Sequence, residues 1–159
     1  MSGSGYVKML RESLEKKVAI LSNIESANED QARILSDQMS TPDEFQENLD
    51  IKGRLISEID RIDSGFQEMF ERVREVLSMD KESYKDDILE MQNLIREITD
   101  RSTHIQLQEQ ENKMLAEKKF AEVRAAARDI KKNEKVVTSY YQNMMQLNNV
   151  DPQFLDSKK

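Results

Sequence analysis

Apolar residues recur through the second half of this chain at alternating steps of four and three, the spacing of one seam on a helix. The series runs through Tyr84, Ile88, Met91, Ile95, Ile98, Ser102, Ile105, Glu109, Asn112, Ala116, Lys119, Val123, Ala126, Ile130, Asn133, Val137, Tyr140, Met144 and Leu147. Neighbouring helices bury such a seam, so the pattern predicts one long helix over about 81–147 that packs against other helices.

Two earlier segments have the same periodicity. The first, at about 6–39, carries the apolar stripe Val7, Leu10, Leu14, Val18, Leu21, Ile24, Ile34 and Leu35. The second, at about 42–77, carries Leu55, Ile59, Ile62, Phe66, Met69, Val73 and Val76. Between them, Thr41 suits the helix cap, Pro42 the first helical position and Glu44 the third position after the cap. We therefore expect an all-α chain in which three helices form an antiparallel bundle or coiled coil.

The first two predicted helices, of about 34 and 36 residues, are too short to cover a third helix of some sixty residues. We expect a single helical domain over 1–159 whose long C-terminal helix protrudes, with a mobile segment at about 130–159. Gly53 and Gly65 fall inside the second helix, where each costs about 1 kcal/mol relative to Ala. Close packing against another helix would explain these glycines, and so would a tolerated weakness.

The seam of the third helix is interrupted by polar residues at Ser102, Glu109, Asn112 and Lys119. Our expectation is that these residues lie where the bundle is thin and wet. In the alternative, a buried Asn or a buried ion pair fixes the register of the helices at some cost in stability.

The end of the third helix has a broad apolar face rich in Tyr and Met. Its rows are Val136, Tyr140 and Met144, then Val137, Tyr141 and Met145, flanked by Ile130 and Leu147. Tyr offers a large contact area at low entropic cost, and Met adapts to irregular partners. Two interpretations stay open. The face packs on the first or second helix or on a second copy, or it is a groove or latch for a partner helix.

Composition agrees with long helices that share narrow seams. Charged residues make up 35% and hydrophobic residues 37% of the 159 residues, against roughly 25% and 45–50% in globular domains. The net charge of −7 and the short basic run at Lys131, Lys132 and Lys135 disfavour nucleic acid as a partner. No apolar run approaches the ~18 residues of a membrane span, and the N-terminus has no secretory pattern. We expect a cytoplasmic protein without membrane insertion.

Enzyme motifs are absent from the sequence. There is no cysteine and a single histidine, His104, so thiol catalysis and any site that needs two histidines are excluded. A carboxylate-bridged metal bundle needs two Glu-x-x-His motifs, and the residue three before His104 is Arg101. We expect no enzyme activity, cofactor or metal, and we expect His104 to be a partly exposed helix residue.

The stretch at 105–115, IQLQEQENKML, resembles the corresponding stretch of FlgN-type flagellar export chaperones, which has an Asn three residues before a Leu near mid-helix. Asn112 and Leu115 match that pattern. The layout of the chain is also similar to the family in its first segment with Leu14, Leu21 and Ile24, in its second helix, in the late pair Tyr140-Tyr141 and in its ending FLDSKK.

The resemblance implies a cytoplasmic type III secretion chaperone for the hook-associated proteins of the hook–filament junction. Such a chaperone binds the helical C-terminal region of these subunits, keeps them unpolymerised and delivers them to the export apparatus. The client-binding face that it implies here is Ile130, Val137, Tyr140, Tyr141, Met144, Met145 and Leu147. The related class of filament-cap chaperones also stays open for this chain. The alternative function is a non-enzymatic coiled-coil adaptor or a homodimeric scaffold.

Overall fold

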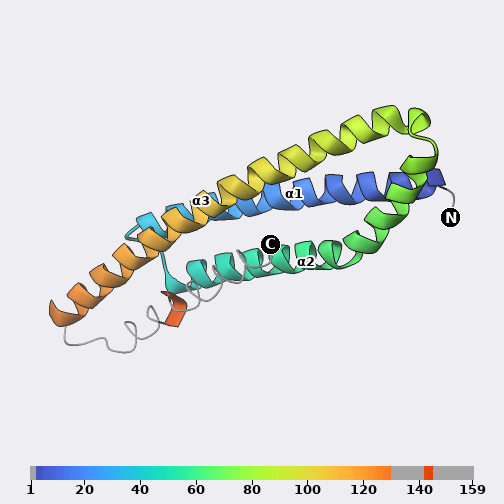
Figure 1. Ribbon diagram of the computed structural model, residues 1–159. Coiled ribbons are helices and arrows are strands. Elements are labelled where there is room, and N and C mark those ends of the chain that lie inside the picture. Colours follow the sequence, from blue (N-terminus) through green and yellow to red (C-terminus); the bar gives the residue numbers. More distant parts are fainter. Residues whose placement is uncertain (1–2, 130–141, 145–159) are drawn as a thin grey trace.

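The computed structural model describes residues 3–129 and 142–144, and these residues are almost wholly helical, without a strand (Figure 1). Helix α1 spans Gly3–Ser36, α2 spans Pro42–Met79, the short 3-10 helix η1 spans Glu82–Tyr84, and α3 spans Lys85–Asp129. The predicted all-α class is confirmed. None of the described helices has the length and apolar character needed to cross a lipid bilayer.

The connection between α1 and α2 has the capping chemistry that its sequence predicts. The Oγ1 atom of Thr41 accepts a hydrogen bond from the backbone N–H of Glu44 at 3.2 Å, and Pro42 is the first helical residue. Before this cap, the Ser40 hydroxyl donates to the carbonyl of Ile34 at 2.6 Å, which satisfies an acceptor at the end of α1. The connection therefore takes five residues, 37–41, and hydrogen bonds pair several of its backbone groups.

The second connection lies at the predicted break. Helix α2 ends at Met79, and the carboxylate of Asp80 accepts hydrogen bonds from both the backbone N–H and the hydroxyl of Ser83. These bonds hold the turn that leads through η1 into α3. Asp86 and Asp87 follow in the first turn of α3, where the partial positive charge of the helix end favours carboxylates.

Helix α1 makes the main contacts with both other long helices. Its side chains meet α2 in opposite numerical order, Lys17 with Asp63 and Gln31 with Asn48. They meet α3 in the same numerical order, Arg11 with Asp87, Glu25 with Arg101 and Asn28 with Gln108. The long helices lie along one another in Figure 1.

Three apolar clusters follow one another along the long helices. The first contains Val7, Leu10, Leu14, Val73 and Met91. The second contains Ile20, Leu21, Ile24, Ile59 and Ile105. The third, which we call the cup, contains Ile34, Leu35, Phe45, Leu49, Ala116 and Met144. The second cluster and the cup are separated by buried polar side chains, which are described below.

Residues 142–144 do not continue the line of α3. Met144 packs in the same cluster as Ala116, whereas a straight helix would place these two residues about 42 Å apart at 1.5 Å per residue. The predicted single helix over 81–147 is therefore wrong. The last turns of α3, orange in Figure 1, nevertheless extend past the connection between α1 and α2.

The glycines of α2 do not mark close helix packing. A Cβ atom added at Gly53 or at Gly65 would meet nothing within 4 Å, so the interpretation of close packing is wrong and a tolerated weakness remains. Figure 1 shows that α2 bends in its second half. The pair Ser64-Gly65 lies in that half, and the Ser64 hydroxyl donates to the carbonyl of Arg61 at 2.8 Å. Pairs of Gly and Ser are a recognised cause of helix bending.

Candidate partner-binding site

A buried ion pair joins α2 to α3 at the centre of the molecule. The Nζ atom of Lys52 lies 2.7 Å from Oε1 and 2.9 Å from Oε2 of Glu109. The exposed fractions of these side chains are 0% and 2%. Lys52 also donates to Oε1 of Gln31 on α1 at 3.4 Å. One lysine therefore contacts both other helices, and its charge is neutralised where no water reaches it.

Amide side chains surround this ion pair and extend the polar layer across α1. The Asn112 side chain donates to the carbonyl of Asn28 at 3.0 Å and to Oε1 of Gln31 at 3.1 Å. Gln31 in turn donates to Asn48 at 2.9 Å, and Asn48 donates to the carbonyl of Ala27 at 2.9 Å. All of these side chains are buried. They form the polar layer, which consists of Asn28, Gln31, Asn48, Lys52, Gln108, Glu109 and Asn112.

The expectation of a thin, wet region is wrong at the centre of the seam. Glu109 and Asn112 are each 2% exposed, and Lys119 is buried as well. Glu109 is paired with α2, Asn112 with α1 and Lys119 with the connection after α1, as in the alternative that the sequence left open. Moving one helix along another would break these directional contacts, so the polar layer fixes the register of the three helices.

A second ionic cluster lies beside the polar layer and links α1 to α3. One carboxylate oxygen of Glu25 lies 2.5 Å from Nη1 of Arg101, and the other lies 2.5 Å from Nδ1 of His104. Burial opposes ionisation of Glu25, but the hydrogen bonds from His104 and Arg101 outweigh it and lower the pKa of this carboxyl. His104 is about half exposed, which agrees with its expected place on the surface of a helix.

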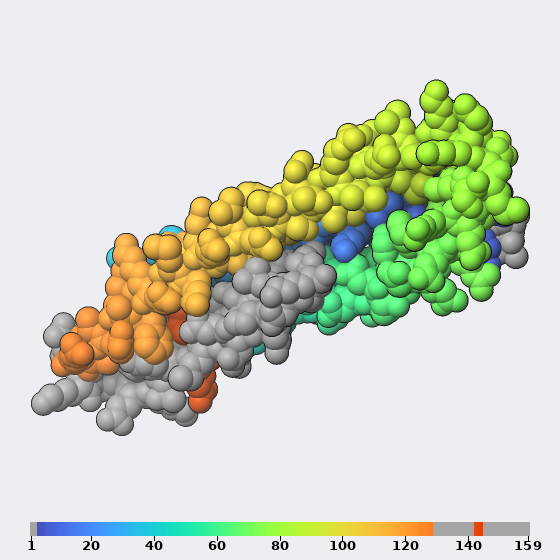
Figure 2. All heavy atoms as spheres, viewed as in Figure 1, coloured from blue at the N-terminus to red at the C-terminus, as the bar shows by residue number. Residues whose placement is uncertain are grey.

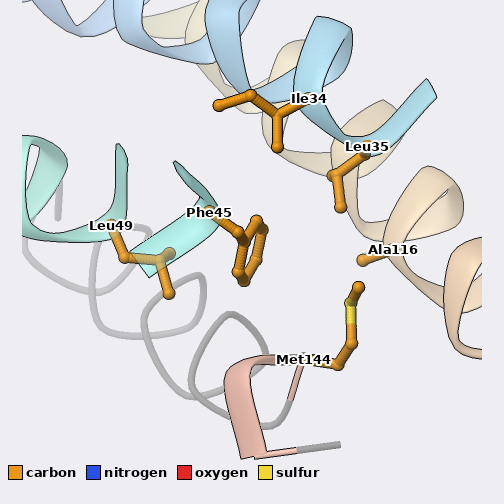
Figure 3. Packing of buried hydrophobic residues seen from close by; sticks show 6 residues of the cluster. All are labelled: Ile34, Leu35, Phe45, Leu49, Ala116 and Met144. Carbon is orange, nitrogen blue, oxygen red and sulfur yellow. The ribbon is translucent and has the colours of Figure 1, made fainter. Parts of the chain in front are cut away.

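The cup lies at the end of the bundle where α1 joins α2. Figure 3 shows Met144 directed into it, toward Ala116 of α3, with the ring of Phe45 and the side chains of Ile34 and Leu35 around it. Met144 is 3% exposed. A space of only about 10 Å³ remains beside it, too small to hold more than one water molecule. The cup is thus a closely fitted site for one apolar side chain.

Two polar contacts flank the cup. The Asn143 side chain donates to the carbonyl of Pro42 at 3.2 Å, next to the cap of α2. The Lys119 ammonium donates to the carbonyl of Asp37 at 2.8 Å and ties α3 to the end of α1. Among the residues that the structure describes, 142–144 contact the three long helices through Met144 in the cup and through the Asn143 hydrogen bond.

Of the predicted client-binding face, Met144 lies in the cup. The other members lie outside the described residues, namely Ile130, Val137, Tyr140, Tyr141, Met145 and Leu147. The role of this face stays a prediction. For Met144, the structure agrees with the interpretation in which the face packs on the chain's own helices.

The two residues of the family pattern lie close to the cup. Asn112 belongs to the polar layer, and Leu115 is half-buried against the cup. Sequence reasoning missed Lys52, although it precedes Ile59 by seven residues and so shares its position on the helix. The spacing places Lys52 on the buried side of α2, whereas its charge argues for an exposed position.

Within 3–129 and 142–144, no group of three His, Asp or Glu side chains is placed to hold a metal ion. Comparisons with models of protein families, with curated proteins and with solved structures give no match to this chain. The resemblance to FlgN-type export chaperones therefore rests on residues of the sequence alone, and the function is argued from the site.

Proposed function

We propose that this protein is a non-enzymatic, cytoplasmic export chaperone of the flagellar type III secretion system. It binds the helical C-terminal region of hook-associated subunits, keeps them unpolymerised and delivers them to the export apparatus. Its architecture in this proposal is an antiparallel three-helix bundle with a protruding third helix. The proposal requires no cofactor, no metal and no nucleic acid.

The observation that carries the proposal is the packing of Met144 in the cup. Residues 142–144 are helical, and Met144 inserts its apolar side chain between α1, α2 and α3. A site of this kind suits an amphipathic helix, which presents single apolar anchors at helical spacing. Because Met144 belongs to the predicted client-binding face, a client that engages this face competes with the cup for the same side chain.

Co-purification with the C-terminal region of a hook-associated subunit tests the proposal. We expect the wild-type chain to retain this region and the double variant Tyr140→Ala, Met144→Ala to lose it. Met39→Ala is the matched control, because Met39 is 85% exposed near the same end of the bundle. Undiminished retention by the double variant would contradict the assigned face, and equal loss in the control would make the effect nonspecific.

Light scattering separates the chaperone from the homodimeric scaffold. A chaperone with a free face is expected to have a mass near 18.6 kDa without a client. A dimer that persists on dilution, and that Met144→Ala dissociates, would favour the scaffold and leave no face for a client.

A further inference from the structure

An apolar groove lies at the other end of the bundle from the cup. It has a volume of about 190 Å³ and is lined by side chains from all three long helices, among them Leu14 of α1, Phe70 and Val73 of α2, and Ile88 and Ile95 of α3. Figure 2 shows the surface hollowed between the green second half of α2 and the yellow-green start of α3, with blue atoms of α1 at its floor. This groove plays no part in the proposed function.

The groove explains why one seam residue departs from the predicted pattern. Met91 and Ile98 pack in the first apolar cluster, but Ile95, which lies between them on the seam, is 45% exposed. On the facing helix Phe70 is 40% exposed, and its ring stacks on that of Phe66 at 5.9 Å between centroids. Two large apolar side chains, one from α2 and one from α3, therefore line the groove and stay partly exposed.

Positive charge gathers at the rim of this groove. Arg74 lines the groove itself, and Lys81 and Lys85 line the adjoining hollow, which is continuous with it at Ile88. The structure gives none of these three cations an ion pair among the residues that it describes. Glu82 lines the same hollow as Lys81 and Lys85. The charged side chains that line the groove and the adjoining hollow are thus three cations and one acid, on a chain whose net charge is −7.

We propose that this groove binds an acidic amphipathic helix of a partner protein. An apolar row on that helix covers Phe70 and Ile95, and carboxylates beside the row meet Arg74, Lys81 and Lys85. Three features favour a helix over a small ligand. The groove lies between two long helices, it is open along one side, and its large apolar side chains come from two facing helices, as where an amphipathic helix is bound. Sites for small ligands enclose most of the ligand surface instead.

Binding of two synthetic peptides to the full chain tests the proposal by fluorescence anisotropy. Both peptides are helices of about 18 residues with the same row of leucines, and they carry either glutamates or lysines beside it. We expect the acidic peptide to bind roughly tenfold more tightly at low salt, because several exposed ion pairs each add a modest amount. The difference is expected to shrink at high salt, where these exposed charges are screened.

Three double variants locate the binding. Phe70→Glu with Ile95→Glu is expected to abolish binding of the acidic peptide. Lys81→Glu with Lys85→Glu, which changes only exposed side chains, is expected to weaken it and to remove the preference for acid. Leu107→Glu with Met114→Glu is the control, because these residues are also exposed on α3 but lie away from the groove. Circular dichroism checks that each variant keeps the helix content of the wild type.

Equal affinity for the two peptides, or no binding of the acidic one, would overturn the proposal. So would acidic-peptide binding that the control variant abolishes and the groove variants leave unchanged. A wild-type chain that dimerises, and that Ile95→Glu makes monomeric, would assign the groove to a second copy of this protein instead. None of these results depends on the cup or on Met144, so the proposed function can fail separately.

Discussion

At the scale of single residues, the chemistry at the centre of the bundle depends on Lys52. A lysine is almost never fully buried unless it is paired, and here Glu109 lies 2.7 Å from its ammonium. Removing both charges from water costs more than the pair regains unless further hydrogen bonds contribute. Gln31 supplies one of these contacts at 3.4 Å. The pair therefore matters more for alignment of the helices than for net stability.

This view predicts opposite results for single and double substitutions of the pair. Lys52→Met leaves Glu109 buried without its cation, and we expect a loss of about 3–5 kcal/mol in the free energy of unfolding. Lys52→Met with Glu109→Leu removes both charges, and we expect stability equal to the wild type or higher by about 1–4 kcal/mol. Urea unfolding at neutral pH measures both values.

Arg54→Met is the control for the lysine substitution, because Arg54 lies two residues after Lys52 on the same helix but is exposed. We expect it to change stability by less than about 0.5 kcal/mol. If Lys52→Met were as mild as Arg54→Met, the ion pair would not hold the place that we assign to it.

The Glu25 cluster predicts a pH dependence. The pKa of Glu25 is lowered below its ordinary value of 4.5 in the folded chain, so its stabilising effect is complete above that value and is lost as pH falls through the lowered pKa. We therefore expect Glu25→Gln to destabilise the protein at about pH 7 and to matter much less at about pH 3. Urea unfolding at the two pH values measures the difference.

Glu29→Gln is the matched control for this prediction, since Glu29 lies one turn further along α1 and is exposed. Its effect is expected to be small at both pH values. A destabilisation by Glu25→Gln that stayed constant from pH 7 to pH 3 would show that the carboxylate charge has no part in the contact.

At the scale of elements, α2 is the long helix whose interior contains residues of low helix propensity. Gly53 and Gly65 lie in its interior, and its second half bends (Figure 1). A glycine in a helix interior loses backbone entropy on folding without contributing a side chain. Neither glycine is required by its neighbours, because a Cβ atom at each position would meet no atom within 4 Å.

We therefore predict that Gly53→Ala and Gly65→Ala each raise the free energy of unfolding by roughly 0.5–1 kcal/mol. Thermal unfolding followed by circular dichroism measures the gain. Gly3→Ala is the contrasting variant, because its Cβ atom would lie 3.0 Å from Cγ1 of Val76 and force that side chain to move. A gain at Gly3 equal to the gain at Gly53 would contradict the explanation from local space.

At the scale of the whole molecule, three distinct regions follow one another along the long helices. The apolar groove lies near the start of α1, the polar layer lies in the middle, and the cup lies where α1 joins α2. The polar layer sets the alignment of the helices, and so determines which side chains meet at the two ends. Both proposed binding sites thus depend on the same buried contacts, although they lie too far apart to share residues.

The sequence by itself determined the helical class and the two connections. Periods of four and three require helices, and the cap at Thr41 and Pro42 and the polar break before Tyr84 set where they stop. These features are local, since each depends on residues within a few positions of one another. The seam likewise predicted which face of α3 is buried, including Ile105 and Asn112.

Only the tertiary structure decided what the seam residues meet. The same polar residues suit a wet gap or a dry ionic layer, and the choice depends on Lys52 and Gln31, which lie far from Glu109 in the sequence. The same holds for Ile95, exposed on an apolar seam, and for Met144, buried beside Ala116 instead of far beyond it. Periodicity states which side of a helix is apolar, but only the placement of other helices determines how much of that side is covered.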